Sequence, residues 1–144
     1  MDHAKRQGPF WDAIEGRAPM PPAAQLLGWK RRAIDPERGT IHVEFEAREE
    51  FLNPIGTVQG GILTAMLDDT MGPALAATLA KGEFAPTLNL NVSFHRPAKV
   101  GVIHGKGRVI KRGKDVCYLA GELFQEGELI ASATATALVR GSKA

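Results

Sequence analysis

Cysteine is almost absent from this sequence, and aromatic side chains make up only 6% of it. The one cysteine, Cys117, cannot form a disulfide within the chain or a cysteine-rich metal site, and a lone cysteine is typical of a reducing compartment. The first ten residues contain no apolar core of the kind that a signal peptide carries. We therefore expect a cytoplasmic protein.

Neither sign of charge dominates, because 18 basic residues stand against 16 acidic ones and the formal net charge is +2. No basic stripe is interleaved with aromatic residues, so we expect no nucleic-acid partner. The longest apolar stretch, Gly61–Ala80, contains two adjacent acids, Asp68 and Asp69. Such a pair is rare in a membrane span, so the stretch predicts a buried core helix and no membrane partner.

The length of 144 residues fits one domain with a core of its own. We place the domain at residues 24–144 and interpret residues 1–23 as an N-terminal extension. Within the extension, Pro9–Glu15 is a candidate short helix, and the three prolines of Ala18–Pro22 indicate a connector.

Alternating apolar and polar residues indicate strands on both sides of the apolar stretch. Two strands precede it, at Trp29–Ile34 and Thr40–Ala47, and four follow, at Thr87–His95, Val102–Lys111, Val116–Gln125 and Leu129–Val139. This order predicts an α+β fold, in which an antiparallel sheet of about six strands wraps around one long central helix. Small residues in the last strand, Ala131–Ala137, would let that helix lie close.

The segment from Asn53 to Ala80 begins as a glycine-rich loop and continues as the predicted helix. N–H groups at a helix start have no partner within the helix, and Gly60 and Gly61 let another molecule approach them closely. An oxygen that develops negative charge would be stabilised there. Asp68 is a candidate catalytic carboxylate, while Asp69, about 100° further round the helix, is expected to form a structural hydrogen bond.

A set of spaced residues resembles a known family. The set is Asn53-x-x-Gly56-x-x-Gln59-Gly60-Gly61, an acid nine residues after the glutamine, Thr87 at the start of a strand, Phe94-x-Arg96-Pro97-Ala98, a Lys-Arg-Gly-Lys turn and a final Leu129-Ile130-Ala131 strand. Over residues 24 to 140 it resembles the hotdog-fold thioesterases, in particular the phenylacetic-acid-degradation (PaaI-like) branch.

The resemblance implies hydrolysis of an acyl-coenzyme A thioester, with an aromatic or medium-chain acyl group, and without a metal or another cofactor. It implies that Asp68 is the nucleophile or the general base and that the Gly60 N–H polarises the thioester carbonyl. Asn53 would orient the water or the thioester, and Thr87 would hold the water or the acid. The family usually has histidine where this chain has Gln59, an amide that can position a substrate but cannot transfer a proton near neutral pH.

Several of these residues have a second interpretation. Asn53, before Pro54, could be only a turn residue, and Thr87 only a strand former. The basic residues Lys111, Arg112, Lys114 and Arg96 could bind the phosphates of coenzyme A or simply face solvent. The histidines at 42, 95 and 104 lie on separate predicted strands, so we expect no metal site.

The spacing along the helix predicts a homo-oligomer, either a dimer or a dimer of dimers. Gly60 and Asp68 are about 12 Å apart along a straight helix, too far to contact one thioester together. We therefore expect each site to take Asn53 and Gly60 from one chain and Asp68 from its partner. A non-catalytic acyl-CoA-binding protein is the alternative, which Gln59 motivates, and a hydratase of the same fold is a weaker one.

Overall fold

The computed structural model describes residues 6–141. Its helices are α1 (Pro9–Ile14), α2 (Pro22–Leu27), the short 3-10 helix η2 (Glu49–Phe51) and α3 (Gly60–Ala76). Its strands are β1 (Lys30–Asp35), β2 (Thr40–Ala47), β3 (Glu83–Phe84), β4 (Thr87–Phe94), β5 (Gly101–Arg112), β6 (Val116–Gln125), β7 (Glu128–Leu138) and β8 (Arg140–Gly141). Among the described residues, no helix is both long and apolar enough to cross a membrane.

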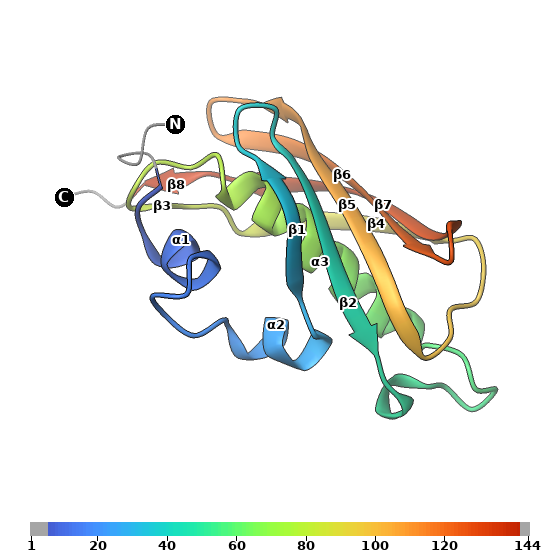
Figure 1. The fold of residues 1–144 in the computed structure, drawn as a ribbon. Coiled ribbons are helices and arrows are strands. Elements are labelled where there is room, and N and C mark those ends of the chain that lie inside the picture. Colours follow the sequence, from blue (N-terminus) through green and yellow to red (C-terminus); the bar gives the residue numbers. More distant parts are fainter. Residues whose placement is uncertain (1–5, 142–144) are drawn as a thin grey trace.

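The main sheet has six antiparallel strands in the order β1-β2-β5-β6-β7-β4, and it curls around α3 (Figure 1). This confirms the α+β class, the six strands and the central helix that the sequence predicts. The separate two-stranded sheet of β3 and β8 was not predicted, because two residues are too few to show alternation.

Helix α3 packs on the sheet where the strands carry glycine. A Cβ atom added at Gly107 would lie 2.9 Å from the backbone oxygen of Thr70, and one at Gly121 would lie 2.8 Å from the Cγ of Met71. One at Gly105 would collide with the hydroxyl of Thr70. The closest approach is therefore made at glycines of β5 and β6, whereas the sequence pointed to the small residues of β7. The helix buries one face against the sheet, with Leu63, Met66, Leu67, Thr70, Met71, Ala74 and Leu75.

The C-terminal end of α3 differs from the prediction, since the helix ends at Ala76 rather than at Ala80. Beyond it the chain tightens into i to i+3 hydrogen bonds, from the N–H of Thr78 to the oxygen of Leu75 and from that of Leu79 to Ala76. The Thr78 hydroxyl also donates to the Leu75 oxygen at 2.7 Å. These bonds satisfy carbonyls that a longer helix would have used.

Strand β4 is an edge of the main sheet, because only β7 pairs with it. The alternation in its sequence is real, but it does not bury one face, since Leu88 and Phe94 are 56% and 54% exposed. An edge strand with unpaired backbone groups and exposed apolar side chains is an available pairing surface.

Candidate active site

The loop before α3 is held together by Asn53. Its side-chain oxygen accepts hydrogen bonds from the N–H groups of Ile55 and Thr57, both at 3.1 Å, and its Nδ2 donates to the Thr57 hydroxyl at 2.8 Å. Asparagine is favoured in turns because it makes such local bonds. Asn53 therefore stabilises the turn, and one hydrogen of its Nδ2 remains for another acceptor.

The first turn of α3 presents free backbone donors. Among the described residues, the N–H groups of Gly60 and Gly61 have no hydrogen-bond acceptor, whereas those of Ile62 and Leu63 donate to the oxygen of Gln59. A Cβ atom added at Gly60 would lie 3.1 Å from the Phe94 ring, and one at Gly61 would meet nothing. The backbone here can therefore receive an anionic oxygen at close range.

Asp68 lies two turns further along α3, on its exposed side. The hydroxyl of Thr87, the first residue of β4, donates a hydrogen bond of 3.0 Å to Asp68 Oδ1. The structure thus brings together two predicted site residues that are 19 positions apart. The bond fixes one carboxylate oxygen and leaves Oδ2 available to a water molecule or a substrate.

Asp69 occupies a different environment from its neighbour. Among the described residues its Oδ2 is buried without a hydrogen-bond partner, so the hydrogen bond expected of this side chain is not made at that atom within one chain. Burial, and then the negative charge of Asp68, raises the pKa of Asp69 to about 7. This carboxyl group is suited to hold a proton near neutral pH.

The two halves of the expected site lie apart on one chain. Helix α3 and strand β4 run past each other, so that Gly60 lies against Phe94 at one end of β4 and Asp68 bonds to Thr87 at the other. Gly60 and Asp68 are eight residues apart on α3, which is about 12 Å at 1.5 Å per residue. One chain therefore cannot apply the Gly60 N–H and the Asp68 carboxylate to the same carbonyl.

The other predicted residues divide between these two ends. Gln59 is exposed at the start of α3, and its side chain makes no capping hydrogen bond. Arg96, just beyond Phe94, pairs with Glu128 at 3.2 Å. In the basic turn Arg112 lies 3.8 Å from Glu83 and donates to the oxygen of Gly113 at 2.7 Å, while Lys111 and Lys114 are exposed.

Two features were not anticipated. Trp29 donates from its indole Nε1 to the backbone oxygen of Asp69 at 2.8 Å, next to the catalytic candidate. Pro73 was the signal for it, because proline removes the N–H that would bond to the oxygen four residues earlier.

His42 and His104, predicted as separate, meet on neighbouring strands with ring nitrogens 3.0 Å apart, although no metal-ligand group of three is found among the described residues.

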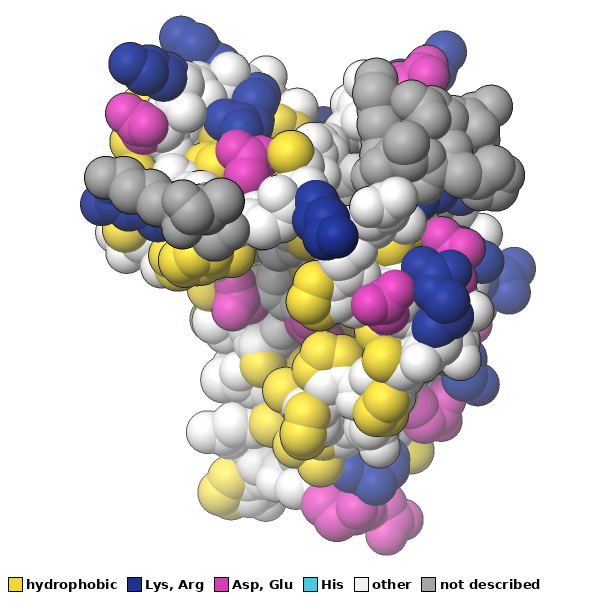
Figure 2. All heavy atoms as spheres, turned by 90° about the vertical axis from the view of Figure 1, so that its left-hand side faces the viewer, with side chains coloured by type: hydrophobic (Ala, Val, Ile, Leu, Met, Phe, Trp, Pro, Cys, Tyr) yellow, Lys and Arg dark blue, Asp and Glu magenta, His cyan; other side chains and the backbone are white. Residues whose placement is uncertain are grey.

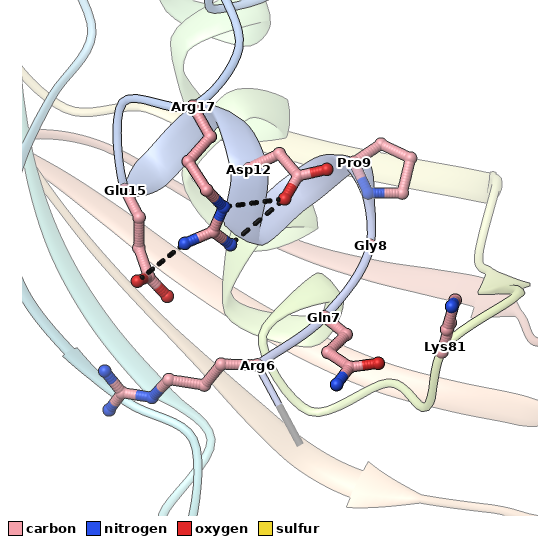
Figure 3. Close-up of a pocket in the computed structure, with 8 residues that line it drawn as sticks. All are labelled: Arg6, Gln7, Gly8, Pro9, Asp12, Glu15, Arg17 and Lys81. Carbon is pink, nitrogen blue, oxygen red and sulfur yellow. Dashed lines mark hydrogen bonds and ion pairs between the residues drawn. The ribbon is translucent and has the colours of Figure 1, made fainter. Parts of the chain in front are cut away.

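A wide polar cavity of about 610 Å³ lies away from these residues, beside α1 (Figure 3). Its charges are largely paired with one another, since Arg17 bonds to Asp12 at 3.0 Å and to Glu15 at 3.1 Å. Neither Asp68 nor Gly60 lines it. We therefore assign the chemistry to α3 and β4 and not to this cavity.

Known proteins are similar to this chain in sequence and in fold. The family model described as Thioesterase superfamily matches residues 55–132. Acyl-coenzyme A thioesterase 13 of Homo sapiens is 31% identical over 110 residues, which cover 74% of this chain and 77% of that protein. A phenylacetic acid degradation-related protein from Ralstonia eutropha JMP134 is 47% identical, with a TM-score of 0.88 over 90% of this chain and 98% of its own.

The likeness of the fold extends to more distant sequences. The E. coli PaaI protein from the phenylacetic acid degradation operon is 20% identical, with a TM-score of 0.80 over 92% of this chain and 94% of its own. At that identity the likeness concerns the fold, and the chemistry rests on the residues described above.

Proposed function

The chain belongs to the thioesterase superfamily, and from that premise we propose that it hydrolyses acyl-coenzyme A thioesters to a carboxylate and coenzyme A. The observation that carries the assignment of residues is the bond between Thr87 and Asp68 on the exposed side of a helix that starts with two free N–H groups. Hydrolysis of an activated ester requires a base or nucleophile and an oxyanion donor, and these residues supply both.

In the general-base form of the reaction, Asp68 takes a proton from water while the water oxygen attacks the thioester carbon. The carbonyl oxygen becomes negative and is stabilised by the Gly60 N–H. When the carbon–sulfur bond breaks, the leaving thiolate takes the proton back from Asp68. In the nucleophilic form, Asp68 itself attacks and water then hydrolyses the anhydride. Label in Asp68 after a single turnover in ¹⁸O-labelled water identifies the nucleophilic form, in which water attacks the anhydride at the carboxyl carbon of Asp68 and releases the substrate carboxylate.

The edge strand β4 supports a homodimer that completes the site. If β4 pairs antiparallel with the same strand of a second copy, the two-fold axis sets Thr87 of one chain opposite Phe94 of the other. Asp68, bonded to Thr87, then approaches Gly60 of the partner subunit, which lies against that Phe94. The same pairing covers the exposed apolar side chains of β4.

The composite site is tested by mixing two inactive variants, Asp68→Asn and Asn53→Ala, and allowing subunit exchange. The second variant disables the other half, because Asn53 holds the loop that leads to Gly60. In a heterodimer one site receives two intact halves, so activity should return to about half of wild type per heterodimer. If each site were built within one chain, every site would still carry one of the two substitutions and no activity would return. No activity in a mixture that is shown to contain heterodimer would therefore falsify the composite site.

The groups named here complete the chemistry without a cofactor other than the coenzyme A of the substrate, so dialysis against a chelator should leave kcat unchanged. A panel of acyl-CoA substrates, including phenylacetyl-CoA and straight chains, read out with a thiol-reactive dye, tests the reaction itself. Release of free thiol that Asp68→Asn removes supports the proposal. We also propose that the protein acts in the cytoplasm.

A further inference from the structure

An apolar groove of about 250 Å³ lies between α1, the C-terminal half of α3 and the segment that leads to β3. These elements meet at the end of the molecule opposite the loop that precedes α3 (Figure 1). Seen from that side, hydrophobic side chains reach the surface between charged ones (Figure 2). The residues that give the groove its apolar walls are Phe10, Trp11, Ala76, Leu79, Phe84 and Ala85.

Gly72 lines this groove from the C-terminal half of α3. Glycine within a helix is destabilising relative to alanine, so its presence there calls for a packing reason. The residues that the structure describes provide none, because a Cβ atom added at Gly72 would meet none of their atoms within 4 Å. The space beside Gly72 is therefore open to a molecule other than this chain.

The groove is continuous with the catalytic face of α3. Gly72 follows Asp68 by four residues and Ala76 follows by eight, so all three lie along one side of the helix. The distance from Asp68 to the groove is about one turn, close to 6 Å along the axis. A thioester carbonyl held at Asp68 can thus direct its acyl chain along Gly72 towards α1.

A second feature of the groove is its indole. Trp11 is 2% exposed, and its Nε1 has no hydrogen-bond partner among the described residues. Trp11 reaches the groove from α1, in the stretch that the sequence assigns to an N-terminal extension. Residues 7–11 of this stretch thus form one wall of the groove.

We propose that this groove holds the apolar tail of the acyl group, and that α1 sets the length of tail the protein accepts. The inference rests on the proposed hydrolysis of acyl-CoA, and it specifies a medium-chain or aryl substrate. The volume of about 250 Å³ is slightly below the roughly 300 Å³ at which ligand pockets begin, so the groove fits a medium-chain or aryl tail better than a long fatty chain.

The test narrows the groove with Gly72→Leu and widens it with Phe84→Ala. Phe84 is 57% exposed, so its truncation should leave the fold intact. The control is Leu26→Ala, which removes an equally exposed side chain, at 53%, from α2 outside the groove. Each protein is assayed with straight-chain acyl-CoA from acetyl to myristoyl, and its dimer is checked by size-exclusion chromatography.

We expect Gly72→Leu to lower kcat/KM for octanoyl-CoA by about 10-fold or more relative to kcat/KM for acetyl-CoA, because one carbon in an apolar pocket changes specificity by about 10- to 200-fold. Phe84→Ala should shift the preferred chain to a longer one, and Leu26→Ala should change neither. If Gly72→Leu is poorly folded, Gly72→Ala provides the same comparison with a smaller group in a helix that alanine favours.

Binding of S-octyl- and S-ethyl-coenzyme A, thioethers that cannot be hydrolysed, separates this inference from the proposed function. Weaker binding of the octyl compound alone to Gly72→Leu supports the groove even if wild type hydrolyses no acyl-CoA. An equal loss for all chain lengths, or unchanged octyl binding, overturns it. Dissociation of the dimer by Gly72→Leu also overturns it, because the open space would then belong to a partner subunit.

Discussion

The indole Nε1 of Trp29 donates a hydrogen bond of 2.8 Å to the backbone oxygen of Asp69. Pro73, four residues later, has no N–H, so this oxygen lacks its usual donor within the helix. Trp29 is only 9% exposed, so water could not easily replace it. Trp29, which directly precedes β1, thus supplies the hydrogen bond that α3 lacks because of Pro73. The carbonyl that receives it belongs to the residue after Asp68.

Trp29→Phe should therefore lower the free energy of unfolding by about 1–3 kcal/mol, because it leaves a buried carbonyl without a donor. Trp11→Phe is the matched control, since the buried Nε1 of Trp11 has no hydrogen-bond partner in the part of the chain that the structure describes. Urea denaturation of both variants measures the difference. Equal losses in the two variants would show that packing of the ring, and not the hydrogen bond, stabilises the helix.

Asp69→Asn should make stability less dependent on pH. Burial and the charge of Asp68 raise the pKa of Asp69 from 3.8 to about 7. The unfolded chain loses this proton near pH 3.8 while the folded chain keeps it until about pH 7, so the free energy of unfolding falls as pH rises between these values. The variant should gain Tm relative to wild type at pH 8 and change little at pH 4. An equal change at both values would mean that Asp69 gains a partner in the oligomer.

Asp68→Asn should lower kcat by on the order of 10²-fold or more with little change in KM, because the carboxylate acts mainly in the transition state. Thr87→Val should lower kcat less, since it removes only the hydrogen bond that orients Asp68. Steady-state kinetics on one acyl-CoA substrate compares both with Asp69→Asn, which should retain most of kcat. A larger loss in Asp69→Asn would reverse the roles of the two acids.

Replacing Lys111, Arg112 and Lys114 together by alanine should raise KM for acyl-CoA more than KM for a short acyl thioester without the nucleotide. Only the former carries phosphates for these cations to bind. KM for the same two substrates is also measured for Arg96→Ala, which removes a basic residue at the other end of β4. Equal effects on both substrates would assign the basic turn to solvent.

The sequence predicted the family, the sheet and the central helix because alternation and the glycine loop are local patterns. It also pointed to Thr87 and Asp68, which the structure joins by a hydrogen bond. Pro73 indicated that the Asp69 oxygen lacks a donor within the helix, but the sequence could not show that Trp29 supplies it, because a partner 40 residues away leaves no periodic signal. The early end of α3 was missed for a related reason, since the apolar stretch continues to Ala80 and the capping by Thr78 depends on geometry.

The glycines of β5 and β6 make this protein sensitive to substitution at positions away from the proposed catalytic residues. A single methyl group at Gly105 or Gly121 would push α3 away from the sheet, because Thr70 and Met71 already occupy that space. Displacement of the helix would carry Asp68 with it, away from Thr87. Substitutions at Gly105 and Gly121 should thus reduce activity as much as substitutions at Asp68. A screen of random variants for lost activity should recover substitutions at all three positions.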